Sequence, residues 1–189
     1  MATPIGHSLL GVVFAKQFNK NISLRDAWKL YLLAIVCANA PDFDFIPGLL
    51  IGEMHRYHQG ITHSFVYAIC IGLCAAIVAP KLDIQRLKAF MVGFFACCSH
   101  LLMDFFGRDG REPIGMPLFW PFLDSHWISP TPLLLGVRHG RPGDSKEEII
   151  QNLFSMHNAM GILFEIGFCV IVFLIFAAFH FGKTIWQKG

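Results

Sequence analysis

The sequence predicts an all-α, membrane-embedded bundle of about four to five helices with one long loop. Apolar residues make up 54% of the chain and charged residues 15%, whereas soluble domains carry about 45–50% and about 25%. The stretch 159–181 is apolar throughout most of its length and could cross about 30 Å of hydrocarbon. Two further apolar stretches, 62–79 and 89–106, form a helical hairpin. We expect residues 1–189 to fold as a single membrane-embedded domain.

Each expected helix follows from an apolar stretch and the residues that end it. The first stretch covers 5–18, and the second runs from Trp28 to Ala40 and ends at Pro41. Apolar stretches this short are more typical of core or re-entrant helices than of full membrane spans. In the hairpin, Thr62 is expected to cap the third helix and Asp83 the fourth.

Residues 107–145 are predicted to form a long extramembrane loop. Prolines and glycines recur along it, with Phe119, Trp120, Phe122 and Trp127 between them. Loops of this length in compact domains are usually lids or binding loops. Tryptophan and phenylalanine also suit the surface of a membrane.

Charge and cysteine content exclude two classes of protein. A net charge of +2 with no basic stripe argues against direct nucleic-acid binding. The six cysteines lie in apolar stretches without C-x-x-C spacing, so they are expected to be small core residues and not a disulfide or zinc framework.

Histidine and aspartate residues gather at one end of the predicted bundle. His100 and Asp104 lie four residues apart and therefore project from one helix face. If short connections make successive helices alternate in direction, seven such side chains arrive at the same side. They are His7, Asp42, Asp44, His58, His63, His100 and Asp104.

This set of side chains predicts a divalent metal site. Imidazole and carboxylate groups without thiolates suit zinc, manganese or iron, and seven ligands exceed the need of one tetrahedral ion. We therefore expect a divalent metal, with zinc as the first candidate and ligands enough for two or more ions. Such a centre can activate water and hold the oxygens of a phosphoryl group.

Simpler readings of the same residues remain open. His100 and Asp104 could be a buried hydrogen-bonded pair that fixes helix packing. Asp42 and Asp44 could form an ordinary turn after Pro41. Glu165, inside the last apolar stretch, should face the interior of the bundle, where a structural hydrogen bond is the expected role.

The distribution of basic residues predicts how the protein is oriented in the membrane. With alternating helices, nine of the fifteen lie on the side away from the site. These are Lys16, Lys20, Arg25, Lys29, Lys81, Arg86, Lys88, Lys183 and Lys188. Because cytoplasmic ends of membrane helices are enriched in Lys and Arg, the site is predicted on the extracytoplasmic face.

Five motifs in order resemble a known family. They are Gly6-His7-Ser8, Pro41-Asp42-Phe43-Asp44, His58-Gln59-Gly60-Ile61-Thr62-His63-Ser64, Ser99-His100-Leu101-Leu102-Met103-Asp104 and Pro117-Leu118-Phe119-Trp120-Pro121. This pattern, from about Gly6 to Phe122, resembles the YdjM-like membrane-bound metal-dependent hydrolases, also described as LexA-binding, inner-membrane-associated hydrolases. That family is itself similar, at a distance, to zinc-dependent phospholipase C and P1-type nucleases.

The resemblance implies roles for particular residues. His7, Asp42, His63, His100 and Asp104 would be metal ligands. Asp42 would also be a general base, and Asp44 is a second catalytic candidate.

The chain also departs from the family pattern. Gln59 replaces a common arginine, for which Arg56 could substitute, and Phe45 stands where the family often has histidine. No downstream His-x-x-x-Glu motif is found.

Two functions are therefore predicted. The first is a multi-pass inner-membrane hydrolase that uses metal-activated water on a phosphoester of a lipid or lipid-linked substrate. The alternative is a non-catalytic metal-binding membrane protein that acts as transporter, sensor or interaction partner. A LexA-type partner follows only from the family's description, and LexA is cytoplasmic.

Overall fold

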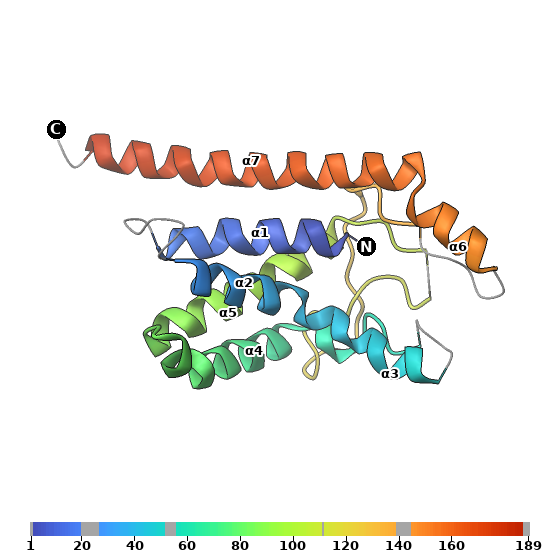
Figure 1. The fold of residues 1–189 in the computed structure, drawn as a ribbon, viewed down its shortest axis with the longest axis horizontal. Helices are drawn as coiled ribbons and strands as arrows, with labels where there is room; N and C mark the ends of the chain where they lie inside the picture. Colours follow the sequence, from blue (N-terminus) through green and yellow to red (C-terminus); the bar gives the residue numbers. More distant parts are fainter. Residues whose placement is uncertain (1, 20–26, 52–55, 111, 139–144, 187–189) are drawn as a thin grey trace.

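The computed structural model describes residues 2–19, 27–51, 56–110, 112–138 and 145–186, and these form an all-α bundle with a long loop, as predicted (Figure 1). The α-helices are α1 (Pro4–Gln17), α2 (Trp28–Asn39), α3 (Phe45–Leu50), α4 (Phe65–Val78), α5 (Arg86–Phe105), α6 (Lys146–Leu153) and α7 (Met156–Trp186). Short 3-10 helices connect them at η1 (Ala40–Asp44), η2 (Ile61–His63) and η3 (Ala79–Leu82). One isolated β-bridge joins Met116 and Trp127 in the loop.

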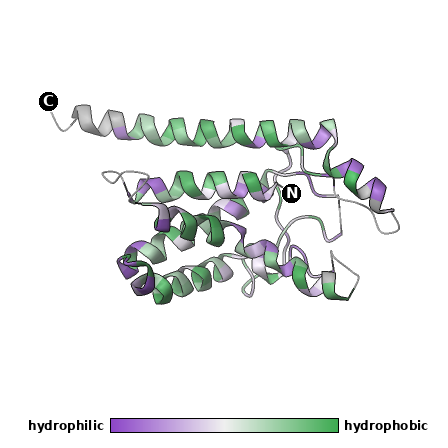
Figure 2. Cartoon of the chain, viewed as in Figure 1, coloured by the Kyte–Doolittle hydropathy of each residue, from purple (hydrophilic) through white to green (hydrophobic). Residues whose placement is uncertain are grey.

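Within the part of the chain that the structure describes, four helical stretches are long and apolar enough to cross a membrane. They are Trp28–Gly48, Phe65–Leu82, Arg86–Phe105 and Ile150–His180. Figure 2 shows their predominantly hydrophobic colouring. The 14-residue helix α1 is shorter than these stretches, as the short apolar stretch at 5–18 predicted.

Helix α2 ends at Asn39, just before Pro41 as predicted, but further helical turns follow it. The chain continues through η1 into α3. Proline is tolerated in the first turn of a helix because its missing N–H has no partner to lose there. Asp42 and Asp44 are thus held on a 3-10 turn, and not in an irregular segment.

Two predicted caps are wrong. Ser64 caps α4, because its hydroxyl accepts a hydrogen bond from the backbone N–H of Tyr67 at 3.2 Å. Thr62 lies earlier, within η2. Asp83 forms an ion pair with Lys29 at 2.8 Å, while α5 begins after Gln85 without a side-chain cap.

The C-terminal region contains a helix that was not predicted. Helix α6 begins with a capping box, in which the side chains of Ser145 and Glu148 each accept from the other residue's backbone N–H. The next helix, α7, starts at Met156, three residues before the predicted stretch. It packs beside α1 along one side of the bundle (Figure 1).

Small residues allow the central helices to pack closely. A β-carbon placed on Gly11 of α1 would lie 2.7 Å from Cβ of Ala38 in α2 and 3.7 Å from Cβ of Ala96 in α5. Small residues at such crossings are typical of membrane helices, because they let the backbones approach. All six cysteines lie in the described residues and are free thiols.

We expect Gly11→Val to destabilise the bundle by about 1–3 kcal/mol, because the added carbons have no room between α1 and α2. The measurement is thermal unfolding of the purified protein in detergent. Gly167→Val on α7 is the matched control, since a β-carbon there would meet nothing within 4 Å. Equal stability losses for the two variants would contradict the packing argument.

The loop after α5 turns back over the end of the bundle. The backbone N–H of Ser129 donates to the carbonyl of Phe105 at 2.9 Å, and that of Leu133 donates to Phe106 at 2.9 Å. The N–H of Phe65, at the start of α4, donates to the carbonyl of Leu118 at 2.9 Å. The loop therefore lies where α5 ends and α4 begins.

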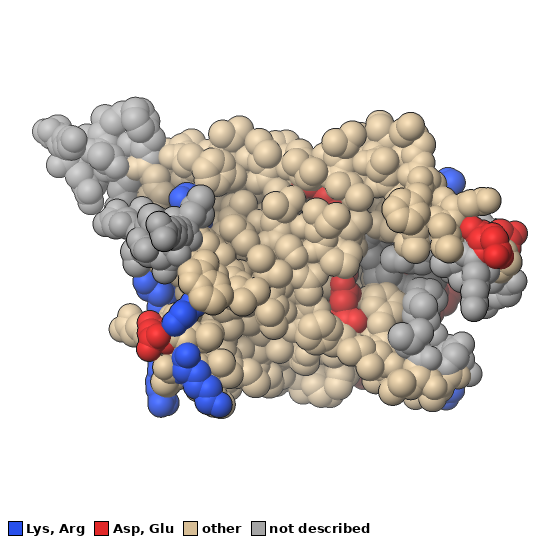
Figure 3. Space-filling view, in the orientation of Figure 1, with Lys and Arg blue, Asp and Glu red and all other residues tan. Residues whose placement is uncertain are grey.

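Basic residues gather at the opposite end of the molecule, near η3 (Figure 3). Lys29 and Asp83 form their ion pair there. Lys20, Arg25 and Lys188, which were part of the predicted basic set, lie outside the described residues.

Candidate metal centre

All seven predicted site residues meet at one end of the bundle. His7 lies in the first turns of α1, Asp42 and Asp44 in η1, His63 in η2, and His58 just before it, while His100 and Asp104 lie in the last turns of α5. All of these side chains except His7 form two adjoining groups, each of which could hold a metal ion. The first contains Asp42, His63, His100 and Asp104, and the second contains Asp44, His58 and His63.

The spacing in the first group suits a metal ion. Nε2 of His100 lies 3.2 Å from Nε2 of His63, 3.4 Å from Oδ2 of Asp104 and 3.5 Å from Oδ1 of Asp42. Nε2 of His63 lies 3.6 Å from Asp104 and 3.8 Å from Asp42. Ligand atoms bound tetrahedrally at about 2.0–2.2 Å are roughly 3.3–3.6 Å apart. Only modest movement would bring these four side chains onto one ion.

Hydrogen bonds orient both imidazoles toward the centre of the group. Nδ1 of His100 lies 2.8 Å from the carbonyl of Ala38, which can only accept, so Nδ1 carries the proton. Thr62 donates its hydroxyl hydrogen to Asp44 at 2.7 Å, and its oxygen lies 3.0 Å from Nδ1 of His63. With both Nδ1 atoms donating, the two Nε2 lone pairs face each other, and a cation between them is favourable.

The environment of His63 attracts positive charge. Burial lowers the pKa of His63, but the nearby carboxylates of Asp104 and Asp44 outweigh burial and raise the pKa to about 9. A metal cation would experience the same electrostatic attraction as the proton.

Within the site, two buried side chains carry atoms with no hydrogen-bond partner among the described residues. Both ring nitrogens of His7 and Oδ2 of Asp104 are in this position. Such atoms are rare in folded proteins. Bonds to a metal ion would satisfy Oδ2 of Asp104 and Nε2 of His7, which faces Asp42 and Asp104, so the residues present fit a metal centre.

The carboxylates of Asp42 and Asp104 each face two ways. One oxygen of each faces His63 and His100, while the other faces Nε2 of His7, at 4.0 Å for Asp42 and 3.6 Å for Asp104. The ring of His7 also stacks on that of His100, with centroids 3.7 Å apart. Both carboxylates are therefore placed to bridge two positions.

The second group supports the first through His63. Oδ1 of Asp44 lies 2.8 Å from Nδ1 of His58, and its Oδ2 lies 3.4 Å from Nδ1 of His63. Burial lowers the pKa of His58, which favours the neutral, metal-binding form of the imidazole. Phe45 stacks on the His58 ring, with ring centroids 3.8 Å apart, and so helps to hold that imidazole in place.

We expect Thr62→Val to weaken metal binding about 10–100-fold, because the hydroxyl that links His63 to Asp44 is lost. Thr62→Ser keeps the hydroxyl and should bind nearly as wild type does. Competition with a chromophoric chelator measures the affinity. Equal weakening by both substitutions would show that the hydroxyl does not orient His63.

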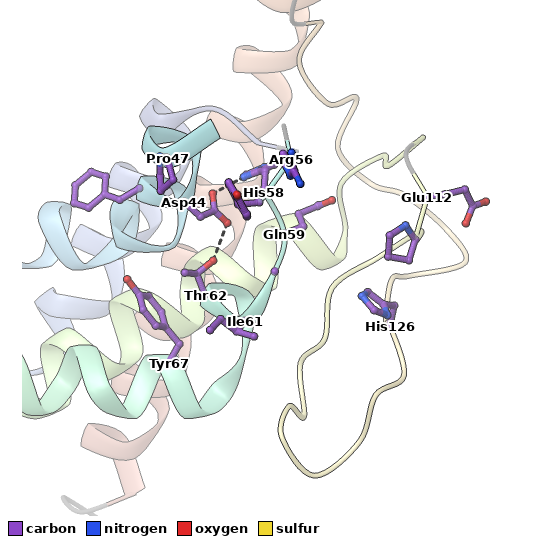
Figure 4. A pocket seen from close by; sticks show the side chains of 14 residues that line it. Asp44, Pro47, Arg56, His58, Gln59, Ile61, Thr62, Tyr67, Glu112 and His126 are labelled. Carbon is purple, nitrogen blue, oxygen red and sulfur yellow. Dashed lines mark hydrogen bonds and ion pairs between the residues drawn. The ribbon is translucent and has the colours of Figure 1, made fainter. Parts of the chain in front are cut away.

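An open cavity of about 810 Å³ adjoins the second group (Figure 4). Asp44, His58 and Arg56 line one side of it, and His126 and Glu112 of the loop lie across from them. The last two were not among the predicted site residues. Neither stands in a recognisable motif, and only the return of the loop over the bundle brings them to the cavity.

The fold and the site define a helical membrane protein with a buried histidine–aspartate centre that could hold a metal ion. The model of the YdjM inner membrane protein family matches residues 1–185, and the chain belongs to that family. The match extends well beyond the motifs at Gly6 to Phe122. No curated protein matches the chain, and no solved structure does.

Proposed function

We propose that the protein is a membrane-bound, metal-dependent hydrolase that cleaves a phosphoester bond in a lipid or lipid-linked substrate. The observation that supports this proposal most directly is the first group, in which two imidazole nitrogens and two carboxylate oxygens converge with suitable spacing. Asp42 and Asp104 each direct one oxygen toward His63 and the other toward His7, which favours two ions. The ligand types favour zinc.

The chain's own residues have distinct roles in this proposal. A divalent metal held there would supply Lewis-acid activation of water and of a phosphoryl oxygen. Asp42 is 19% exposed, while the His63, His100 and Asp104 side chains are fully buried. Asp42 is therefore the ligand best placed to accept the proton of an attacking water. Asp44 keeps His58 and His63 in position.

The surroundings of the cavity favour an amphiphilic substrate. Arg56 lines the cavity together with the exposed apolar side chains of Phe43, Tyr57 and Ile61. Ile46, on neighbouring α3, is also exposed. A substrate with an anionic phosphate and an acyl chain would match this combination, and loop 107–145 would act as its lid.

The proposed topology is a multi-pass inner-membrane protein with the centre on the extracytoplasmic face. The basic end near η3 would then be cytoplasmic, because Lys and Arg are enriched at the cytoplasmic ends of membrane helices. Reporter domains inserted in loop 107–145 test this topology. Activity of a reporter that works only outside the cytoplasm is expected, and activity of a cytoplasmic reporter alone would reverse the orientation.

The function is tested by metal analysis of the purified protein beside hydrolysis assays. Wild type should carry stoichiometric transition metal and hydrolyse a phospholipid or a chromogenic phosphodiester in mixed micelles. Asp104→Ala should lose both properties. A wild type without metal would exclude the proposal, and a metal-loaded protein without turnover across the panel would favour the non-catalytic alternative.

A further inference from the structure

Glu165 is a buried carboxylate in the middle of α7. Glu165 is 1% exposed and lies within the longest apolar stretch of the described chain. A carboxylate in a membrane helix is costly and is usually retained for a specific contact. Glu165 has such contacts, and they are made with the first residues of the chain and not with the metal centre itself.

The carboxylate holds the start of α1 through Thr3. The backbone N–H of Thr3 donates to Oε1 of Glu165 at 2.8 Å, and the hydroxyl of Thr3 donates to Oε2. A carboxylate at a helix N-terminus is also favoured by the helix dipole. Gly6 permits this approach, since a β-carbon there would collide with the Glu165 carboxylate and lie 2.8 Å from Cε of Met103.

Thr3 in turn connects directly to the site. Its carbonyl accepts from the backbone N–H of His7 at 3.0 Å, and its hydroxyl oxygen accepts from the N–H of Gly6 at 3.1 Å. The neighbouring residue, Ala2, donates its backbone N–H to Oδ1 of Asp104 at 3.0 Å. The position of Thr3 therefore controls both the His7 ring and the rotation of the Asp104 carboxylate.

We propose that Glu165 is a positioning residue for the metal centre: by holding Thr3, it places His7 beside Asp104 and turns Oδ2 of Asp104 toward His63 and His100. This inference rests on the metal centre of the proposed function. Helix α7 packs mainly against α1. Through Thr3, Glu165 connects α7 to the helix that carries His7. Carboxylates that orient metal ligands typically change affinity 10–100-fold when removed.

The test compares Zn²⁺ affinity and the absorption spectrum of the Co²⁺-substituted protein among variants in detergent. Glu165→Ala should weaken binding about 10–100-fold and alter the Co²⁺ spectrum. Glu165→Gln, which keeps an acceptor for the Thr3 N–H, should retain most of the affinity. Leu163→Ala, on the exposed part of the same helix, is the control and should bind as wild type does.

A double substitution separates positioning from general stability. If Glu165 acts through His7, Glu165→Ala should weaken binding less than about threefold when added to His7→Ala. Wild-type affinity in Glu165→Ala, or an undiminished further loss in the His7→Ala background, would overturn the inference. If Glu165→Ala does not fold, Thr3→Val, which removes the hydroxyl that donates to Glu165, replaces it in both comparisons, and an unchanged Co²⁺ spectrum in that variant would count against the proposal. A wild type without metal would instead contradict the proposed function.

Discussion

His100→Ala is expected to abolish stoichiometric metal binding, with Zn²⁺ affinity reduced by at least about 100-fold. The imidazole lies within 3.2–3.5 Å of three other candidate ligand atoms, and its orientation is fixed by the carbonyl of Ala38. Its removal takes one nitrogen from the first group and also removes the ring on which His7 stacks. Metal content of the purified variant, measured by elemental analysis, gives the result.

The matched control is His157→Ala. His157 lies at the start of α7 and its Nε2 is 3.1 Å from the carbonyl of Gly136, away from both groups. This variant should keep the wild-type metal content. Full metal content in His100→Ala, with helicity unchanged by circular dichroism, would show that the ion is bound elsewhere.

Asp42→Asn is expected to reduce kcat about 10²–10⁴-fold, because an amide cannot accept the proton of the attacking water. The substitution keeps the shape of the side chain, and His63, His100 and Asp104 remain as ligands. Metal content should therefore fall less than activity does. The measurement is kcat for a micellar phosphodiester, beside metal analysis of the same preparation.

Asp124→Asn, an exposed acidic residue of the loop, serves as the control and should leave kcat unchanged. A parallel loss of metal and activity in Asp42→Asn would assign Asp42 a ligand role alone. Wild-type kcat in this variant would remove Asp42 from the proposed mechanism.

Much of the architecture was predictable from apolar stretches. The bounds of α1, α2, α4 and α5 lie within a few residues of the predicted ones, because an apolar stretch and its flanking polar residues define a membrane helix locally. The meeting of the seven polar residues at one end also followed from helix direction alone. Metal binding and catalysis by those residues remain proposals.

Features set by tertiary contact were not predictable in the same way. Helix α2 ends just before Pro41 as predicted, but the 3-10 turn η1, which has Pro41 in its first turn, and helix α3 follow it directly and were not predicted. The Thr62 hydroxyl connects His63 to Asp44 and leaves the helix cap to Ser64. The contact between Glu165 and Thr3 joins residues 162 positions apart, and no local pattern marks it.

The burial of the centre has a consequence for how an ion would enter and leave it. His7, His63, His100 and Asp104 are at most 2% exposed, so exchange must pass beside Asp42 or wait for helices to separate. In the proposed holoprotein, occupancy is then governed by kinetics more than by equilibrium. Chelators should remove the ion slowly, and the ion found in the purified protein should be the one that was present when the bundle assembled.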